Sequence, residues 1–299
     1  MNELRHPRYW PTWIGIGLVR VLASAPLPVL YALGNGIGEL TFRGFASRRA
    51  IAARNVERCF PELDETRRRE ILRSSFRIVG QSVFCTGVNW WARAERLERL
   101  VRTRDRHHYD DALAAGSNVI LLAPHFIALE MGGVFLSRER AMISMYQRAK
   151  NKVVDEYVRR GRSRFGGEMV ERKSPMGALV RAIRRGKPFY YLPDQDAGRR
   201  GLMVPFFGLP ASTSPALGRF AEVGRALVIP CFTRQVENAG GWEIIFRAPL
   251  ADYPTGDAFE DTRRMNACIE SAVREMPEQY FWLHKRFKTR PPGEPDFYA

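Results

Sequence analysis

From residue 119 onward, short apolar runs alternate with stretches of helical periodicity, and this alternation restricts the folds open to the chain. Short, nearly uncharged runs are typical of strands that are covered on both faces. They occupy residues 119–123, 141–146, 169–171, 189–192, 227–232 and 242–246, and the helical stretches lie near 129–137, 152–164, 176–184, 215–223 and 257–276. We therefore expect an α/β fold with a mostly parallel central sheet and helices on both faces.

The chain before the first apolar run has helical periodicity from residue 48 to about 113. Asp64 is a favourable N-cap, and a long amphipathic pattern follows it. One later segment is harder to interpret, because residues 201–208 are apolar without a clear period. These residues either line a groove for an apolar ligand or belong to the core.

The first 45 residues are rich in apolar side chains, and we expect them to form a membrane-associated helical segment. A spanning helix needs about 20 predominantly apolar residues. Here Arg20 interrupts the apolar stretch and two prolines break it, while aromatic rings preceded by arginines lie at its start. The segment 1–45 is thus either a tilted single span or a helix in the interface. A buried helical hairpin is the alternative, and residues 46–299 form the remaining domain.

The composition favours anionic partners, since 47 Lys and Arg against 32 Asp and Glu give a net charge of +15. A nucleic-acid-binding role is disfavoured by the apolar N-terminus and by the lack of a recognition motif. The four cysteines have no CxxC spacing, which is typical of buried thiols in a reducing compartment and predicts no zinc site. The glycines of "GNGIGE" do not complete a dinucleotide-binding GxGxxG pattern.

The stretch "VILLAPHFIALEMGG" places His125 at the carboxyl end of an expected strand, where open α/β sheets keep their sites. Glu130 falls in the first turns of the expected next helix. If the carboxylate accepts one ring N–H, it fixes the tautomer, and the other ring nitrogen is free to take a proton from an attacking hydroxyl. The alternatives are a structural histidine and a glutamate that stabilises the helix start.

Wider blocks of sequence carry a resemblance to a known family. They are "HPRYW", "HFIALEMGG", "YLPDQDAG" and "PEQYFWLHKRFKTRPPGEP", which together extend over nearly the whole chain. With them the chain resembles the late acyltransferases of lipid A biosynthesis, the lauroyl/myristoyl acyltransferase family of Gram-negative bacteria. The HxxxxD/E element alone would be shared with glycerol-phosphate acyltransferases in general.

The resemblance implies roles for individual residues. His125 matches the catalytic base of the family and Glu130 its acidic partner. In the block "YQRAKNKVVDEYVRRGRSRFGG", the arginines are expected to bind phosphate or carrier-linked anions. The implied substrate-binding residues are Arg148, Arg162, Arg164, Asp194 and Asp196. No metal is expected, and His284 in the basic C-terminal cluster is a rival candidate base.

The implied reaction transfers a fatty acyl chain from acyl carrier protein to a hydroxyl of a phosphorylated glycolipid, a lipid A precursor of the Kdo-lipid IVA type. No cofactor is expected beyond the acyl carrier protein thioester. The implied location is the inner membrane, with the active site facing the cytoplasm. Two alternatives stay open at this point. One is an acyl-CoA-dependent acyltransferase acting on another glycolipid or phospholipid, and the other is a non-enzymatic basic protein that binds membranes.

Overall fold

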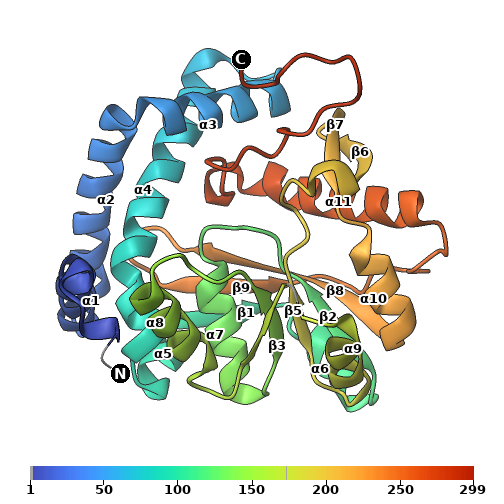
Figure 1. Cartoon of the computed structure of the whole chain (residues 1–299), viewed down its shortest axis with the longest axis horizontal. Helices are drawn as coiled ribbons and strands as arrows, with labels where there is room; N and C mark the ends of the chain where they lie inside the picture. The colour runs from blue at the N-terminus through green and yellow to red at the C-terminus, as the bar shows by residue number, and fades with distance from the viewer. Residues whose placement is uncertain (1–2, 173) are drawn as a thin grey trace.

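A computed structural model describes residues 3–172 and 174–299 and confirms a mixed α/β fold with a mostly parallel sheet (Figure 1). The seven-stranded sheet has the order β1-β9-β8-β2-β5-β3-β4. Neighbouring strands run parallel except β8 and β9, which are antiparallel. The strands are β1 (Val101–Arg104), β2 (Asn118–Leu122), β3 (Ile143–Tyr146), β4 (Glu168–Glu171), β5 (Phe189–Tyr191), β8 (Ala226–Gln235) and β9 (Trp242–Phe246).

The sheet separates two hydrophobic cores, because successive side chains of a strand point to opposite faces. In β2, Ile120 and Leu122 pack into one core, and Val119 and Leu121 pack into the other. The first core is covered by α9 (Met176–Arg184), α10 (Ala216–Gly224) and α11 (Ala258–Glu275). The second is covered by α5 (Ala94–Leu100), α6 (His107–Ala114) and α7 (Leu129–Glu139). Helix α8 (Lys152–Ser163) joins β3 to β4.

The first four α-helices of the described chain lie at the left and top of the molecule in Figure 1. They are α1 (Trp10–Leu22), α2 (Leu27–Gly44), α3 (Ala46–Cys59) and α4 (Glu65–Trp91). Elsewhere along the chain, short 3-10 turns lie at Glu3–Arg5, Pro7–Tyr9, Gly198–Arg200 and Pro277–Gln279. Asp64 caps α4 as expected, accepting a hydrogen bond from the Arg67 backbone N–H at 2.7 Å.

The glycines of "GNGIG" serve helix packing. Gly34 and Gly38 of α2 face Gly80 of α4, and a Cβ at any of the three would overlap backbone atoms of the other helix. The two helices therefore pack at very close range along this line.

The N-terminal helices expose much of their apolar surface. Within the described residues, no helix combines the length and hydropathy that crossing a bilayer requires. Instead, α1 buries none of its residues. Together α1 and α2 carry a surface that we call the N-terminal apolar face, made of the exposed side chains Trp10, Ile14, Leu18, Val21, Val29, Leu33, Ile37 and Leu40.

The apolar segment 201–208 belongs to a hairpin that the sequence did not reveal. Strands β6 (Leu202–Phe206) and β7 (Leu209–Thr213) pair antiparallel and pack against α11. Val204 and Phe206 are buried, Phe206 as part of the first core, and the segment does not line the main cavity described below. The interpretation of residues 201–208 as core is therefore the one that holds.

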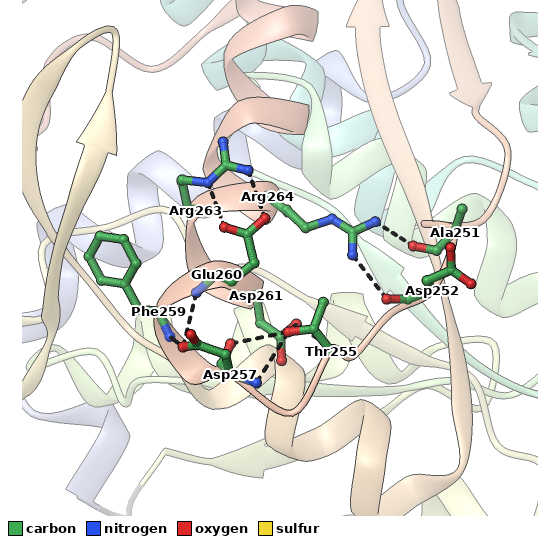
Figure 2. A network of polar contacts seen from close by, with 9 residues as sticks. All are labelled: Ala251, Asp252, Thr255, Asp257, Phe259, Glu260, Asp261, Arg263 and Arg264. Atoms are coloured by element: carbon green, nitrogen blue, oxygen red, sulfur yellow. Dashed lines mark hydrogen bonds and ion pairs between the residues drawn. The ribbon is translucent and has the colours of Figure 1, made fainter.

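Polar contacts fix the start of α11 (Figure 2). The Asp257 carboxylate caps the helix by accepting from the backbone N–H groups of Phe259 and Glu260 at 2.8 and 3.3 Å. Asp261 accepts from the backbone N–H and hydroxyl of Thr255 at 2.7 and 3.0 Å, which ties the preceding loop to the helix. Because its first N–H groups are satisfied in this way, α11 starts at a defined residue.

Candidate active site

The strand order of the sheet brings His125 beside Asp194. Strands β2 and β5 are parallel neighbours, with Leu122 opposite Tyr191. The pairing continues beyond the strand ends, where the Ala123 N–H donates to the Tyr191 carbonyl at 2.9 Å. The segments that follow the two strands thus leave the sheet side by side. His125 comes three residues after the end of β2, and Asp194 comes three residues after the end of β5. This is the carboxyl edge of the sheet, where α/β proteins place their sites.

The Asp194 carboxylate is buried, with 1% of its side chain exposed, and it binds the histidine at two points. Its Oδ1 lies 2.7 Å from Nδ1 of His125, and its Oδ2 accepts from the His125 backbone N–H at 2.9 Å. The Tyr280 hydroxyl also donates to Oδ2, at 2.9 Å. Burial on its own would raise the pKa of Asp194, but His125 and the three hydrogen bonds lower it to about 2. The carboxylate is therefore ionised at neutral pH.

The ionised carboxylate sets the tautomer of His125. A carboxylate only accepts hydrogen bonds, so Nδ1 of the ring carries the proton that it donates to Asp194. Nε2 is then the basic nitrogen, and within the described part of the chain it has no hydrogen-bond partner. With 23% of its side chain exposed, His125 lines the main cavity. This arrangement is suited to taking a proton from a bound group.

Residues 279–281, near the C-terminus, hold in place the loop after β2 that carries His125. The Phe281 N–H donates to the His125 carbonyl at 3.0 Å, and the Ile127 N–H donates to the Gln279 carbonyl at 2.8 Å. Tyr280 forms an isolated antiparallel bridge with Phe126. The loop after β2 is thus paired with residues more than 150 positions away, and the same segment supplies the Tyr280 hydroxyl.

Glu130 contacts a different set of residues from those expected. Its carboxylate accepts from Arg162, with Nη2 at 2.7 Å and Nε at 3.1 Å, and from Trp90 Nε1 at 3.2 Å. Burial would raise its pKa, but the Arg162 charge and these hydrogen bonds lower it. The expected hydrogen bond from His125 to Glu130 is therefore replaced by one to Asp194, because β5 places that carboxylate nearer the ring. A catalytic role for Glu130 stays a prediction.

A cavity of about 680 Å³ lies beside His125 at the carboxyl edge of the sheet. It extends from α4 on one side to β3, α9 and α10 on the other, elements that stand well apart in Figure 1. Glu130 and Arg162 also line it, so the cavity contains both ion-pair systems. Cys85 reaches it from α4, but burial raises the pKa of this thiol to about 12, so it is a poor nucleophile at neutral pH.

The other residues expected to bind substrate are placed differently from one another. Asp196 lines the cavity, and its carboxylate accepts from the N–H and hydroxyl of Thr289, both at 3.0 Å. Arg148 is 69% exposed, pairs with Glu171 and does not line the main cavity. Arg164 does not line it either. It donates to the Ala92 carbonyl at the end of α4 at 2.6 Å, and burial lowers its pKa to about 10. Substrate binding by these residues stays a prediction.

His284, the rival base, accepts a hydrogen bond at Nε2 from the Asp196 N–H at 3.1 Å, so its basic nitrogen is occupied. Burial, followed by the nearby His125, lowers its pKa. Among residues 3–172 and 174–299, no three His, Cys, Asp or Glu side chains are grouped in a way that would hold a metal ion.

Three residues at the site were not identified from the sequence. Tyr280 binds Asp194, Trp90 binds Glu130, and Arg172 lines the cavity, where it has no carboxylate partner in the described structure. Tyr280 lies inside the specific C-terminal block "PEQYFW", which was a usable signal. Trp90 and Arg172 lie outside any pattern that marks function, and only the tertiary structure brings them to the cavity.

Comparison with known proteins defines the class of protein to which this fold and site belong. The family model of bacterial lipid A biosynthesis acyltransferases matches residues 1–289. The chain belongs to this family, as the resemblance predicted, and it is an acyltransferase. The non-enzymatic interpretation is therefore set aside.

Three relatives from Escherichia coli (strain K12) match over almost their whole length. A lipid A biosynthesis lauroyltransferase is 35% identical over 99% of this chain and 97% of its own. A palmitoleoyltransferase is 31% identical over the same shares, and a myristoyltransferase is 33% identical over 98% of this chain and 91% of its own. These relatives are named for three different acyl groups.

Proposed function

We propose that this acyltransferase moves a fatty acyl chain from acyl carrier protein to a hydroxyl of a lipid A precursor of the Kdo-lipid IVA type, with His125 as the general base. The observation that carries the proposal is the pairing of Nδ1 of His125 with the buried Asp194 carboxylate, which leaves Nε2 free at the cavity. The named activities of the relatives support the acceptor class.

The reaction needs no covalent enzyme intermediate. Nε2 of His125 takes the proton of the acceptor hydroxyl as its oxygen attacks the thioester carbonyl carbon. The C–O bond forms, the tetrahedral intermediate collapses, and the C–S bond breaks. The departing thiolate receives the proton from the imidazolium, which restores the neutral ring. Asp194 stabilises the imidazolium during this cycle because it stays ionised and bonded to Nδ1.

The second carboxylate has a separate task in this proposal. Glu130 binds Arg162 with two oxygens and holds the guanidinium at the cavity wall. Arg162 then supplies positive charge for the thioester oxygen as it becomes negative and for phosphate groups on the substrates, together with Arg172, which has no carboxylate partner among the described residues. Glu130 acts here by positioning Arg162, not by contacting His125.

The surface properties support a membrane-bound lipid acceptor and an acidic protein donor. The N-terminal apolar face is suited to the interfacial region of a bilayer, which favours the interface-lying form of the segment 1–45 over a span. The net charge of +15 favours an anionic leaflet and an acidic partner such as acyl carrier protein. We place the enzyme at the cytoplasmic face of the inner membrane on these grounds.

The decisive test is His125→Ala in the full chain. We expect turnover to fall by roughly 10²–10⁴-fold, as for loss of a general base, while binding of the lipid acceptor persists. Mass spectrometry of the product, with acyl carrier protein and CoA thioesters offered in competition, measures both transfer and donor choice. Near-normal turnover of the purified variant would refute the role of His125, and preferential use of the CoA thioester would refute the proposed donor.

A further inference from the structure

The part of the cavity next to α4 is lined by polar side chains that have no assigned task. Helix α4 presents Ser82, Thr86 and Asn89 to the cavity at intervals of three and four residues, which place them on one helix face. Gln235, the last residue of β8, lines the same cavity. We call these four residues the α4 polar wall.

The two carboxamides of this wall are buried without partners. Asn89 is 7% exposed and Gln235 is 4% exposed. Within the described residues, Asn89 Oδ1 and both Gln235 side-chain atoms form no hydrogen bond. A buried polar group without a partner is destabilising, and these three atoms belong to two side chains that line one cavity.

The neighbouring Gln279, unlike Gln235, has partners at both ends of its side chain. Gln279 uses both ends of its side chain on the Gln235 backbone, with its Oε1 accepting at 3.0 Å and its Nε2 donating at 3.1 Å. The hydroxyls of Ser82 and Thr86 donate to carbonyls of their own helix. Ser82, Thr86 and Gln279 thus have partners, whereas Asn89 Oδ1 and the Gln235 carboxamide have none among the described residues.

A pair of carboxamides offers N–H donors and C=O acceptors but no charge. That combination fits a neutral group that both donates and accepts, which is an amide or a hydroxyl. It fits a phosphate poorly, because the amide oxygens would oppose the phosphate charge. A plain alkyl chain fits poorly as well, because it would leave the three atoms unsatisfied.

The position of the wall indicates which substrate carries that group. Helix α4 packs against α2, which bears part of the N-terminal apolar face, and its own Val83 is exposed. The opposite end of the cavity, at Met176 and Phe220, lies on α9 and α10 on the other side of the molecule (Figure 1). A lipid that stays in the membrane reaches the α4 end first.

We propose that Asn89 and Gln235 form a subsite for a hydroxyl or amide group on an acyl chain of the lipid acceptor. The inference rests on the proposed function and adds to it the direction in which the acceptor enters. The donor thioester, whose carrier arm also contains amides, then occupies the end of the cavity near α9 and α10.

Asn89→Leu and Gln235→Met test the subsite, with Gln81→Leu as the matched control. Gln81 is a carboxamide on the same helix, but it donates to Asn35 and does not line the main cavity. We expect each test variant to raise the KM for the lipid acceptor roughly tenfold and to leave the KM for the donor within about twofold. The control leaves both constants near their wild-type values.

Thermal unfolding of the ligand-free full chain gives a second readout. Because the test substitutions remove unsatisfied buried atoms, we expect each to raise Tm by roughly 2–4 °C, whereas a carboxamide with a structural role would lower it on removal. A lowered Tm or an unfolded variant overturns the subsite. So does an unchanged KM for the acceptor, or a rise confined to the KM for the donor.

The experiment separates this inference from the proposed function. Binding of the lipid A precursor in detergent micelles is followed by tryptophan fluorescence without any donor, since Trp90 and Trp242 both line the cavity. If the wild-type chain binds the precursor but does not acylate it, the proposed function fails and the binding data still decide the subsite. If the variants bind as tightly as the wild type, the subsite fails whatever the turnover.

Discussion

At the scale of single residues, the site contains two carboxylates with different partners. Asp194 accepts a hydrogen bond from His125, and Glu130 accepts hydrogen bonds from Arg162. A buried charge is tolerated only where donors surround it, and Asp194 receives three of them. Because these donors hold the carboxylate ionised, the imidazolium of the proposed mechanism has a negative partner at Nδ1.

Asp194→Asn tests this orientation directly. The side-chain amide keeps the size of the carboxylate but loses its charge, so we expect turnover to fall by roughly 10²–10⁴-fold with the KM for both substrates little changed. Steady-state kinetics of the purified variant measures this. A variant that keeps more than about half of the wild-type turnover would show that His125 works without Asp194.

The same variant has a pH signature in its stability. A carboxyl group whose pKa is about 2 in the folded state, against its ordinary value of 3.8, contributes stability that is fully present above pH 4–5 and is lost as the pH falls toward 2. The shift corresponds to about 2 kcal/mol. The difference in unfolding free energy between wild type and Asp194→Asn should therefore shrink by about that amount between pH 7 and pH 2. A constant difference would mean that folding does not lower the pKa of Asp194.

Arg164 lies two residues after Arg162, but the structure gives it a different setting. It donates to the Ala92 carbonyl at the carboxyl end of α4. We therefore expect Arg164→Ala to lower the free energy of unfolding by about 1–2 kcal/mol, with the KM for the lipid acceptor unchanged. Denaturant unfolding and kinetics together decide the matter. A raised KM at unchanged stability would restore Arg164 to substrate binding.

At the scale of helices and strands, local patterns in the sequence account for most of the fold. Apolar runs in the sequence predicted β2, β3, β4, β5, β8 and β9, and an N-cap residue predicted the start of α4. Two elements escaped detection. Strand β1 is only "VRTR", where alternating arginines hide a short edge strand, and the hairpin β6–β7 contains prolines, which are unusual in strands.

The partner of His125 was beyond local reasoning for a related reason. Glu130 is five positions away in sequence, while Asp194 is brought close only because β5 lies next to β2 in the sheet. No spacing along the chain encodes that strand order. The DQD motif at Asp194 and Asp196 was recognised, but its first carboxylate supports the histidine and its second binds Thr289.

The contact between α2 and α4 makes a prediction for two glycines in one helix. A Cβ on Gly38 would meet the backbone of Phe76 and Arg77, whereas one on Gly36 would have nothing within 4 Å. We expect Gly38→Ala to destabilise the protein by about 3 kcal/mol, since the helices have to separate. Gly36→Ala should stabilise it by up to about 1 kcal/mol through helix propensity. Thermal unfolding of the pair measures both, and equal effects would contradict close packing.

At the scale of the whole molecule, the N-terminal apolar face lies near the cavity of the candidate active site. The N-terminal apolar face lies on α1 and α2, and α4 separates it from the cavity (Figure 1). Helix α1 also contacts α8, the helix that carries Arg162, through the Trp13–Tyr157 ring pair and a hydrogen bond between Asn151 and Thr12. In the proposed membrane-bound form, contact of α1 and α2 with the membrane would hold the cavity close to the lipid headgroups.

Leu18→Glu and Leu40→Glu test this arrangement in the full chain. Both side chains are exposed, so the substitutions should leave the fold intact but remove apolar contact with lipid. Burying one such side chain contributes about 1.5–3 kcal/mol, so each variant should bind anionic vesicles roughly tenfold or more weakly than the wild type in a sedimentation assay. Phe259→Glu on α11 is the matched control, because it removes an exposed apolar side chain and adds the same charge away from α1 and α2. If all three variants lose binding equally, attraction between charges alone holds the protein to the vesicle. If neither leucine variant loses binding, the N-terminal apolar face is not the membrane contact.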